Sequence, residues 1–290
     1  GLGSNDAPRL PSDTSGGTGG EEPPLADATT PEGTTTPSAG NPEAGLEFIH
    51  WPSQQRRSDQ RWGPVLTDIV NHLPARYGNT YFDSDLVTTG HETTHGINSH
   101  LRNHKNDSGQ RANGFYVLRD RGVIIPEPPV RKSAAARFVP VSLREMRYKT
   151  YVTGSQSWDD TPLYLFDEWV AYTNGNLVAL DRYTQGIWKE GWRDTFGGVE
   201  FTVYAFALAQ GIEAQKPGYL QSAPQLRAFL AWNARRTMEA YHAMKTLEPF
   251  RWPKLDSYLQ RIRTAPDAEG FRAFVRQLYG PAWAKQVMGF

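Results

Sequence analysis

The segment TTGHETTHGI, residues 88–97, decides how the rest of the chain is interpreted. It contains no proline and its spacing predicts a helix, on which side chains four residues apart lie on the same face. His91 and His95 therefore direct two imidazole rings to one side of this helix, where one metal ion can bind both. Glu92 is rotated by about 100° from His91 and lies at the edge of that face. From there its carboxylate can reach a water molecule on the metal without binding the metal itself.

The residues around this pattern indicate that the helix is buried. Apart from Glu92 and the two histidines, the segment carries no ionisable side chain, and an unpaired charge in the interior is costly. The chain contains no cysteine, so a metal site in it can use only imidazole nitrogens and oxygens. The lack of cysteine also excludes disulfide bonds and a cysteine nucleophile.

The segment resembles the active-site consensus of the zincin metallopeptidases, over about ten residues. The resemblance implies that Zn²⁺ is the cofactor, that His91 and His95 are two of its ligands, and that Glu92 is the general base. It also implies a zincin-like catalytic domain.

A catalytic zinc ion usually takes three protein ligands and leaves one position for water. In the metzincin subclass of the zincins, a Gly and a His follow the second His by three and six residues. Asn98 and Leu101 stand at those positions here, and His100 comes one residue too early. The gluzincin subclass, which takes a Glu from a later helix, therefore fits the chain better.

Two glutamates in predicted helices are candidates for that third ligand, Glu168 and Glu200. We favour Glu168 because Leu163, Phe166, Trp169 and Val170 around it are apolar, and a carboxylate among them needs a partner such as a metal ion. Ala171 and Gly175 follow it by one and two turns and give a narrow face, which would allow close approach to the metal-binding helix. Glu200 stands at an expected helix start, where the helix dipole stabilises a carboxylate without a metal.

Tyrosines one turn on either side of Glu168 are candidates for further roles. Many gluzincins carry an Asp one turn after the Glu ligand, where it orients a ligand His, and Tyr172 stands there in this chain. We therefore expect the Tyr172 hydroxyl, Asp167 or Asp181 to orient the ligand. We also predict that Tyr164 and Tyr172 act in catalysis, as donors to the carbonyl oxygen on which negative charge develops.

A second histidine pair with the same spacing, His100 and His104, follows the first. Two interpretations remain open for it. The pair binds a second metal ion, or it is a solvated helix end at which the helix dipole favours histidine.

Residues 1–45 are rich in Gly, Ser, Thr and Pro and contain few large apolar side chains. They cannot bury enough surface to offset the entropy of ordering, so we predict a flexible tether. Such tethers commonly join a membrane anchor to an exported domain, which suggests a secreted, surface or periplasmic bacterial protein with a lipid anchor. No apolar run reaches the length of about 18 residues that a transmembrane helix needs.

The remaining sequence predicts an α+β fold, with a small β front and a mainly helical C-terminal half. We expect residues 46–160 to form an α/β part that includes the metal-binding helix, and residues 161–290 to form a helical part. The predicted strands span 46–51, 115–118 and 123–125, the last two as a hairpin. The predicted helices span 65–73, 85–101, 161–181, 199–210, 224–244, 254–264 and 269–278. The helix from 161 is expected to be capped by Thr161 and Pro162.

The charge balance bears on the partners of the protein. Lys plus Arg equals Asp plus Glu at 31 each, so no overall positive field attracts nucleic acid. The expected function is zinc-dependent hydrolysis of peptide bonds in a protein or peptide substrate. The alternative is a non-catalytic module that binds a protein or a glycan on a zincin-like fold.

Overall fold

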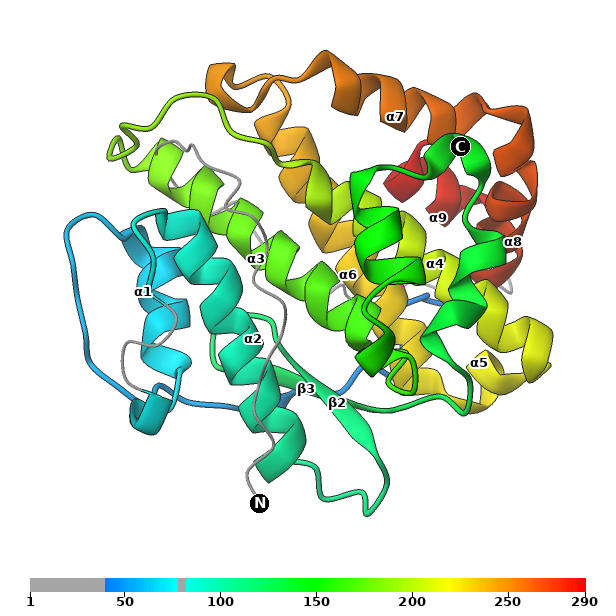
Figure 1. Ribbon diagram of the computed structural model, residues 1–290, viewed down its shortest axis with the longest axis horizontal. Coiled ribbons are helices and arrows are strands. Elements are labelled where there is room, and N and C mark those ends of the chain that lie inside the picture. Colours follow the sequence, from blue (N-terminus) through cyan, green and yellow to red (C-terminus); the bar gives the residue numbers. More distant parts are fainter. Residues whose placement is uncertain (1–39, 78–81) are drawn as a thin grey trace, which may run out of the picture.

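The computed structural model describes residues 40–77 and 82–290, and it is of mixed α+β class (Figure 1). One antiparallel sheet of three strands has the order β1-β3-β2. Its strands are β1 (Ile49–His50), β2 (Ala112–Tyr116) and β3 (Arg121–Pro126). The longer helices are α1 (Gly63–His72), α2 (Leu86–His104), α3 (Tyr164–Thr184), α4 (Phe196–Gln215), α6 (Pro224–Met244), α7 (Pro253–Thr264) and α8 (Glu269–Tyr279).

Short helical segments connect these elements. They are η1 (Ala75–Tyr77), η2 (Lys132–Phe138), η3 (Val141–Leu143), the π-helix η4 (Tyr148–Thr153), η5 (Gln156–Trp158), α5 (Tyr219–Ser222), η6 (Glu248–Phe250), η7 (Pro266–Ala268), α9 (Pro281–Trp283) and the π-helix η8 (Ala284–Met288). None of the described helices is long and apolar enough to cross a membrane.

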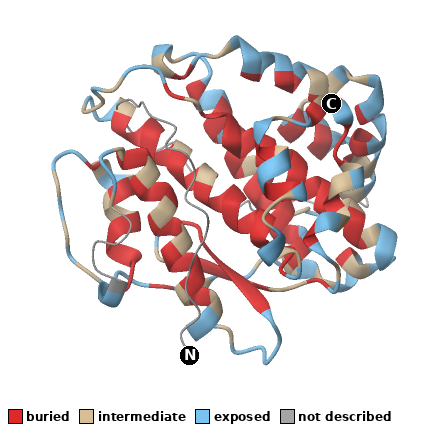
Figure 2. Cartoon of the chain, in the orientation of Figure 1, coloured by how far each residue is buried: buried red, intermediate tan, exposed pale blue. Residues whose placement is uncertain are grey.

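Helix α3 crosses the middle of the molecule and is buried over most of its length (Figures 1 and 2). Its first half, including Phe166 and Trp169, packs into a large apolar cluster with α4, α6 and the C-terminal helices. Its second half, including Val178 and Leu180, packs into a smaller cluster with α1 and α2. The two hydrophobic clusters therefore share one central helix.

Most of the predicted elements are confirmed, with differences at their ends. Helix α2 begins after Asp85, whose carboxylate accepts a hydrogen bond from the Val87 N–H at 3.0 Å, as an N-cap does. The predicted strand 46–51 is shorter, because only Ile49 and His50 pair with β3.

The predicted cap of α3 is wrong. The helix begins at Tyr164, and its N-cap Leu163 makes no side-chain capping hydrogen bond. The carbonyls of Thr161 and Pro162 accept hydrogen bonds from Tyr164 and Leu165 in a turn that precedes the helix. The Thr161 hydroxyl instead bonds Arg111.

Of the predicted tether, residues 1–45, the part up to residue 39 lies outside the described residues. Its last residues do not continue as a tether, because residues 42–45 form a turn. Glu43 in this turn forms an ion pair with Arg235 of α6 at 2.5 Å. A charged contact of this kind fixes the chain to the domain a few residues before the predicted boundary.

Candidate metal centre

Helix α2 brings His91 and His95 together as its spacing predicts. Their Nε2 atoms lie 3.1 Å apart, and the His91 residue is only 7% exposed. A 3.6-residue helical repeat places both rings on the side of α2 that packs against α3. The pair therefore points into the molecule and not toward solvent.

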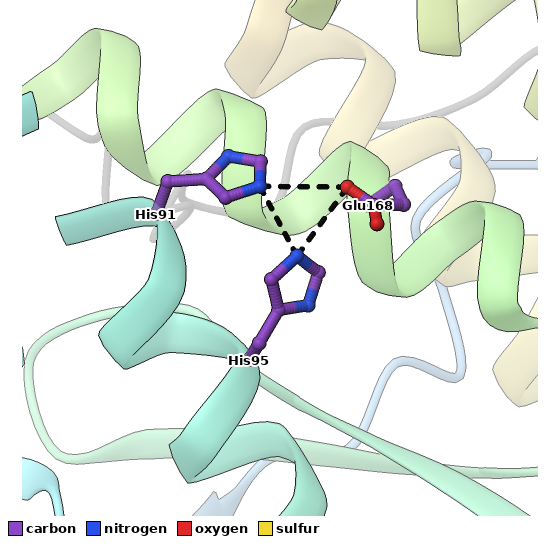
Figure 3. A group of neighbouring side chains, drawn as sticks. All are labelled: His91, His95 and Glu168. Carbon is purple, nitrogen blue, oxygen red and sulfur yellow. Dashed lines mark hydrogen bonds and ion pairs between the residues drawn. The ribbon is translucent and has the colours of Figure 1, made fainter. Parts of the chain in front are cut away.

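Glu168 of α3 completes the group, as Figure 3 shows. Its Oε2 atom lies 3.4 Å from His91 Nε2 and 3.3 Å from His95 Nε2. The other candidate, Glu200, is held elsewhere: its carboxylate forms a buried ion pair with Arg147 at 3.0 Å. Glu200 also lies within the second turn of α4, because that helix begins at Phe196 and not at residue 199 as predicted.

Small residues allow α2 and α3 to approach each other. A Cβ atom on Gly175 of α3 would lie 3.4 Å from Val87 Cγ1 and 3.8 Å from His91 Cβ. A Cβ atom on Gly90 of α2 would lie only 2.9 Å from Val178 Cγ2. The two helices are therefore packed most tightly at Gly90, whereas a Cβ atom at Gly175 would make only ordinary van der Waals contacts with α2.

The three donor atoms fit a tetrahedral metal site. Ligands at zinc bond lengths of about 2.0–2.1 Å lie about 3.3 Å from one another in a tetrahedron, and the three separations here are 3.1, 3.3 and 3.4 Å. Glu168 Oε2 is buried, and the polar atoms it faces are the Nε2 atoms of His91 and His95, at 3.4 and 3.3 Å, so a buried carboxylate oxygen points at two imidazole nitrogens. The donor set and its spacing are both suited to a bound cation.

The electrostatics of the group favour positive charge between the three side chains. Burial would raise the pKa of Glu168, but the charge of His95 and hydrogen bonds with both histidines hold it well below its usual range. Burial would lower the pKa of His95, but Glu168 and Asp167 raise it well above its usual range. A proton on His95 and a metal ion would therefore compete for the same negative environment.

Asp167 is the residue that orients a histidine. Its Oδ1 lies 3.0 Å from His95 Nδ1, which leaves His95 Nε2 directed toward His91 and Glu168. Of the three groups considered for this role, Asp181 accepts a hydrogen bond from Val65 of α1. The Tyr172 ring packs edge-on against the His91 ring, with centroids 4.5 Å apart.

The tyrosines beside Glu168 differ in their hydrogen bonds. The Tyr164 hydroxyl donates to Glu168 Oε1 at 3.1 Å. The hydroxyls of Tyr172 and Tyr151, the latter on η4, are buried and interact with each other, and Tyr172 also interacts with Arg147. Burial raises the pKa of both hydroxyls, so each keeps its proton and can act as a hydrogen-bond donor.

Glu92 follows His91 on α2 and is half-buried. Its carboxylate makes no hydrogen bond and no ion pair with residues 40–77 or 82–290. On α2 it lies about 100° around the helix axis from His91, and its carboxylate is free of partners in the described residues.

The second histidine pair lies against a cation. The Arg76 Nη2 atom of η1 lies 2.9 Å from His100 Nδ1 and 2.7 Å from His104 Nε2. Burial, His104 and Arg76 together lower the pKa of His100 to about 4. A guanidinium group therefore stands where a second metal ion would bind, which disfavours that interpretation.

Two residues beside the metal centre were not assigned from the sequence. Asn98 Nδ2 donates to Asp167 Oδ1 at 2.7 Å, and Arg102 Nη1 lies 3.4 Å from Asp167 Oδ2. They follow His95 on α2 by three and seven residues, which places them on the same helix face. That periodicity is a signal in the sequence that could have identified them.

No family model, no curated protein and no solved structure matches the chain significantly. Its function must therefore be inferred from the chemistry of the site.

Proposed function

We propose that the chain is a zinc-dependent peptidase with a zincin-like domain of the gluzincin type, in which His91, His95 and Glu168 bind zinc. The observation that carries the proposal is the triangle of three donor atoms between α2 and α3, from the buried residues His91 and Glu168 and the partly buried His95. Two imidazoles and one carboxylate are a donor set of catalytic zinc sites. Bound zinc would supply a Lewis acid that lowers the pKa of a coordinated water to about 7 and polarises a substrate carbonyl.

In this proposal the residues around the centre divide the remaining work. Glu92 is the general base that accepts the proton of the attacking water. Tyr172, with Tyr151 beside it, donates a hydrogen bond to the carbonyl oxygen as negative charge develops. Tyr164 was predicted in the same role, but its hydrogen bond to Glu168 is better suited to orienting that ligand.

The alternative is a non-catalytic module that binds a protein or a glycan and uses the metal only for structure. Structural zinc sites are usually closed by four protein ligands, whereas three of the described residues form the group here. This count, and the place of Glu92 directly after a ligand histidine on α2, favour an enzyme.

We also propose that the substrate is a protein or peptide, and that the domain works in the bacterial periplasm, at the cell surface or outside the cell. The Gly-, Ser-, Thr- and Pro-rich composition of residues 1–39 supports a tether, of which a lipid anchor is one common origin. Recovery of the protein from the cytosolic fraction of its source cells would contradict this location.

The proposed function is tested by metal analysis together with hydrolysis of an unfolded protein and of a peptide library. We expect one equivalent of zinc, and activity that a chelator removes and added zinc restores. Glu92→Gln should keep the zinc and lose about 10²–10⁴-fold in rate, as expected for a general base. Glu239→Gln, on the surface of α6, is the matched control and should keep full activity. A wild-type protein without zinc, or an active Glu92→Gln variant, would refute the proposal.

A further inference from the structure

The side chain of Asn98 is fully buried and both ends of its amide are used. The Oδ1 atom accepts a hydrogen bond from the backbone N–H of Tyr116, on β2, at 2.6 Å. The Nδ2 atom donates to Asp167 Oδ1, on α3, at 2.7 Å. Asn98 itself lies on α2, so one side chain connects the metal-binding helix, the sheet and the central helix.

Asp167 transmits this connection to the metal centre. Its Oδ1 atom is bonded by both Asn98 and His95 Nδ1, and its Oδ2 atom faces Arg102. The carboxylate is almost fully buried, so these three neighbours determine its orientation. A ligand imidazole is oriented by the acceptor of its second N–H group, and here that acceptor is itself held by Asn98.

We propose that Asn98 is a positioning residue of the metal centre. Asn98 holds Asp167 in place relative to the backbone of β2. Asp167 then keeps its hydrogen bond with Nδ1 of His95, and Nε2 of His95 stays directed toward His91 and Glu168. The proposal rests on the proposed metal-binding function and adds to it a residue that does not touch the metal. Because Asn98 is bonded to the N–H of Tyr116, the affinity for the metal then depends on the position of strand β2.

The chemistry of the two contacts explains why an amide is required. The N–H of Tyr116 needs an acceptor and the carboxylate of Asp167 needs a donor, and an amide supplies one of each. Leucine, which has the same branching and the same number of side-chain heavy atoms, leaves both groups unsatisfied. Aspartate keeps an acceptor for the Tyr116 N–H but places a second carboxylate beside Asp167. The Asn98→Asp variant therefore removes only the contact with Asp167, which is the one that affects His95.

Asn174 of α3 provides a matched control. It is equally buried, and its Nδ2 atom donates to the backbone carbonyl of the same β2 residue, Tyr116, at 3.0 Å and to Thr94 Oγ1 at 3.2 Å. Its Oδ1 atom accepts from Arg236 at 2.8 Å. Asn174 therefore joins the same three elements without contacting Asp167 or His95.

The experiment compares the full chain with Asn98→Leu, Asn98→Asp and Asn174→Leu. The dissociation constant of zinc is measured by competition with a chromophoric chelator, the geometry of the site from the absorption spectrum of bound Co²⁺, and the stability by chemical denaturation. Both Asn98 variants should bind zinc about 10–100-fold more weakly, with an altered Co²⁺ spectrum. Asn174→Leu should lose stability but change zinc affinity by less than about threefold, since it leaves the orienting pair intact.

The outcomes separate this proposal from the proposed function. If Asn98→Leu and Asn98→Asp bind zinc as tightly as the wild type, the positioning role is wrong while the metal site stands. If Asn174→Leu weakens zinc as much as Asn98→Leu does, the effect is one of general stability and the positioning role is again wrong. A wild-type chain that binds neither Zn²⁺ nor Co²⁺ refutes the metal site itself.

Discussion

Helix α2 carries two histidine pairs, and the residues that contact them have opposite charges. His91 and His95 have ring centroids 4.8 Å apart, and His100 and His104 have centroids 4.6 Å apart. The two pairs share the same spacing along α2. The first pair faces the carboxylate of Glu168, whereas the second faces the guanidinium of Arg76.

The partner of each pair decides what the imidazoles can do. Burial would lower the pKa of His95, but the carboxylates of Glu168 and Asp167 raise it. At His100 burial acts in the same direction as His104 and Arg76, and the pKa falls to about 4. The i, i+4 spacing of histidines is therefore not sufficient for a cation site. A residue distant in sequence decides whether the pair attracts a cation, as Glu168 does, or repels one, as Arg76 does.

The same substitution in each pair gives the largest expected effect. His91→Ala removes one of three proposed ligands and should weaken zinc binding by more than about 100-fold, beyond the loss typical of an outer-shell residue. His100→Ala, the matched control, should leave zinc affinity unchanged. Calorimetric titration of both variants with zinc measures the difference. Equal affinities in the two variants would show that the first pair is not the metal site.

The close contact of α2 and α3 at the first pair can be tested with two glycines. Gly90→Ala places a Cβ atom against the stiff side chain of Val178, so the unfolding free energy should fall by about 1–2 kcal/mol. Gly175→Ala meets only ordinary contacts, and the better helix propensity of alanine should stabilise the protein by up to about 1 kcal/mol. Chemical denaturation of the two variants gives both values. A larger loss in Gly175→Ala would mean that the helices meet differently.

The smallest expected effect is at the second pair. Arg76→Gln removes one of the charges that lower the pKa of His100, so this pKa should rise from about 4, while burial and His104 keep it below 6.5. Between pH 6.5 and 4 the unfolded chain binds the His100 proton and the folded chain does not, so stability falls as the pH is lowered. The variant should lose less stability in this range.

An NMR titration of the imidazole signals measures the shift at His100. His242 on α6 is an internal control, because burial together with Lys245 and Arg263 lowers its pKa and Arg76 is not among the causes. An unchanged His100 pKa would show that Arg76 does not act on this pair.

The sequence was sufficient to predict the elements and the residues that a local pattern carries. The hydrophobic periodicity predicted α2, the hairpin and α3, and the spacing of His91 and His95 predicted their convergence. The apolar neighbours of Glu168 indicated a buried carboxylate that needs a partner, and the structure places it beside the histidines.

What the sequence did not reveal depends on contacts between distant segments. Arg76 contacts His100 and His104 from η1, which precedes α2 in the chain. No local sequence pattern predicts this contact. The sequence also allowed Glu200 as the third ligand, and only the structure shows that it is paired with Arg147. Asn98 was noted only as a departure from another subclass, although it shares a helix face with both histidines.

The central position of α3 has a consequence for how the molecule unfolds. This helix belongs to both hydrophobic clusters and carries the carboxylate that faces the histidines, so neither cluster can open without disturbing the other or the group of Glu168 and the two histidines. The described domain should behave as one cooperative unit. A ligand that binds only the native state raises the stability of the whole unit by mass action, so a cation held by three side chains would raise the free energy of unfolding of the entire domain.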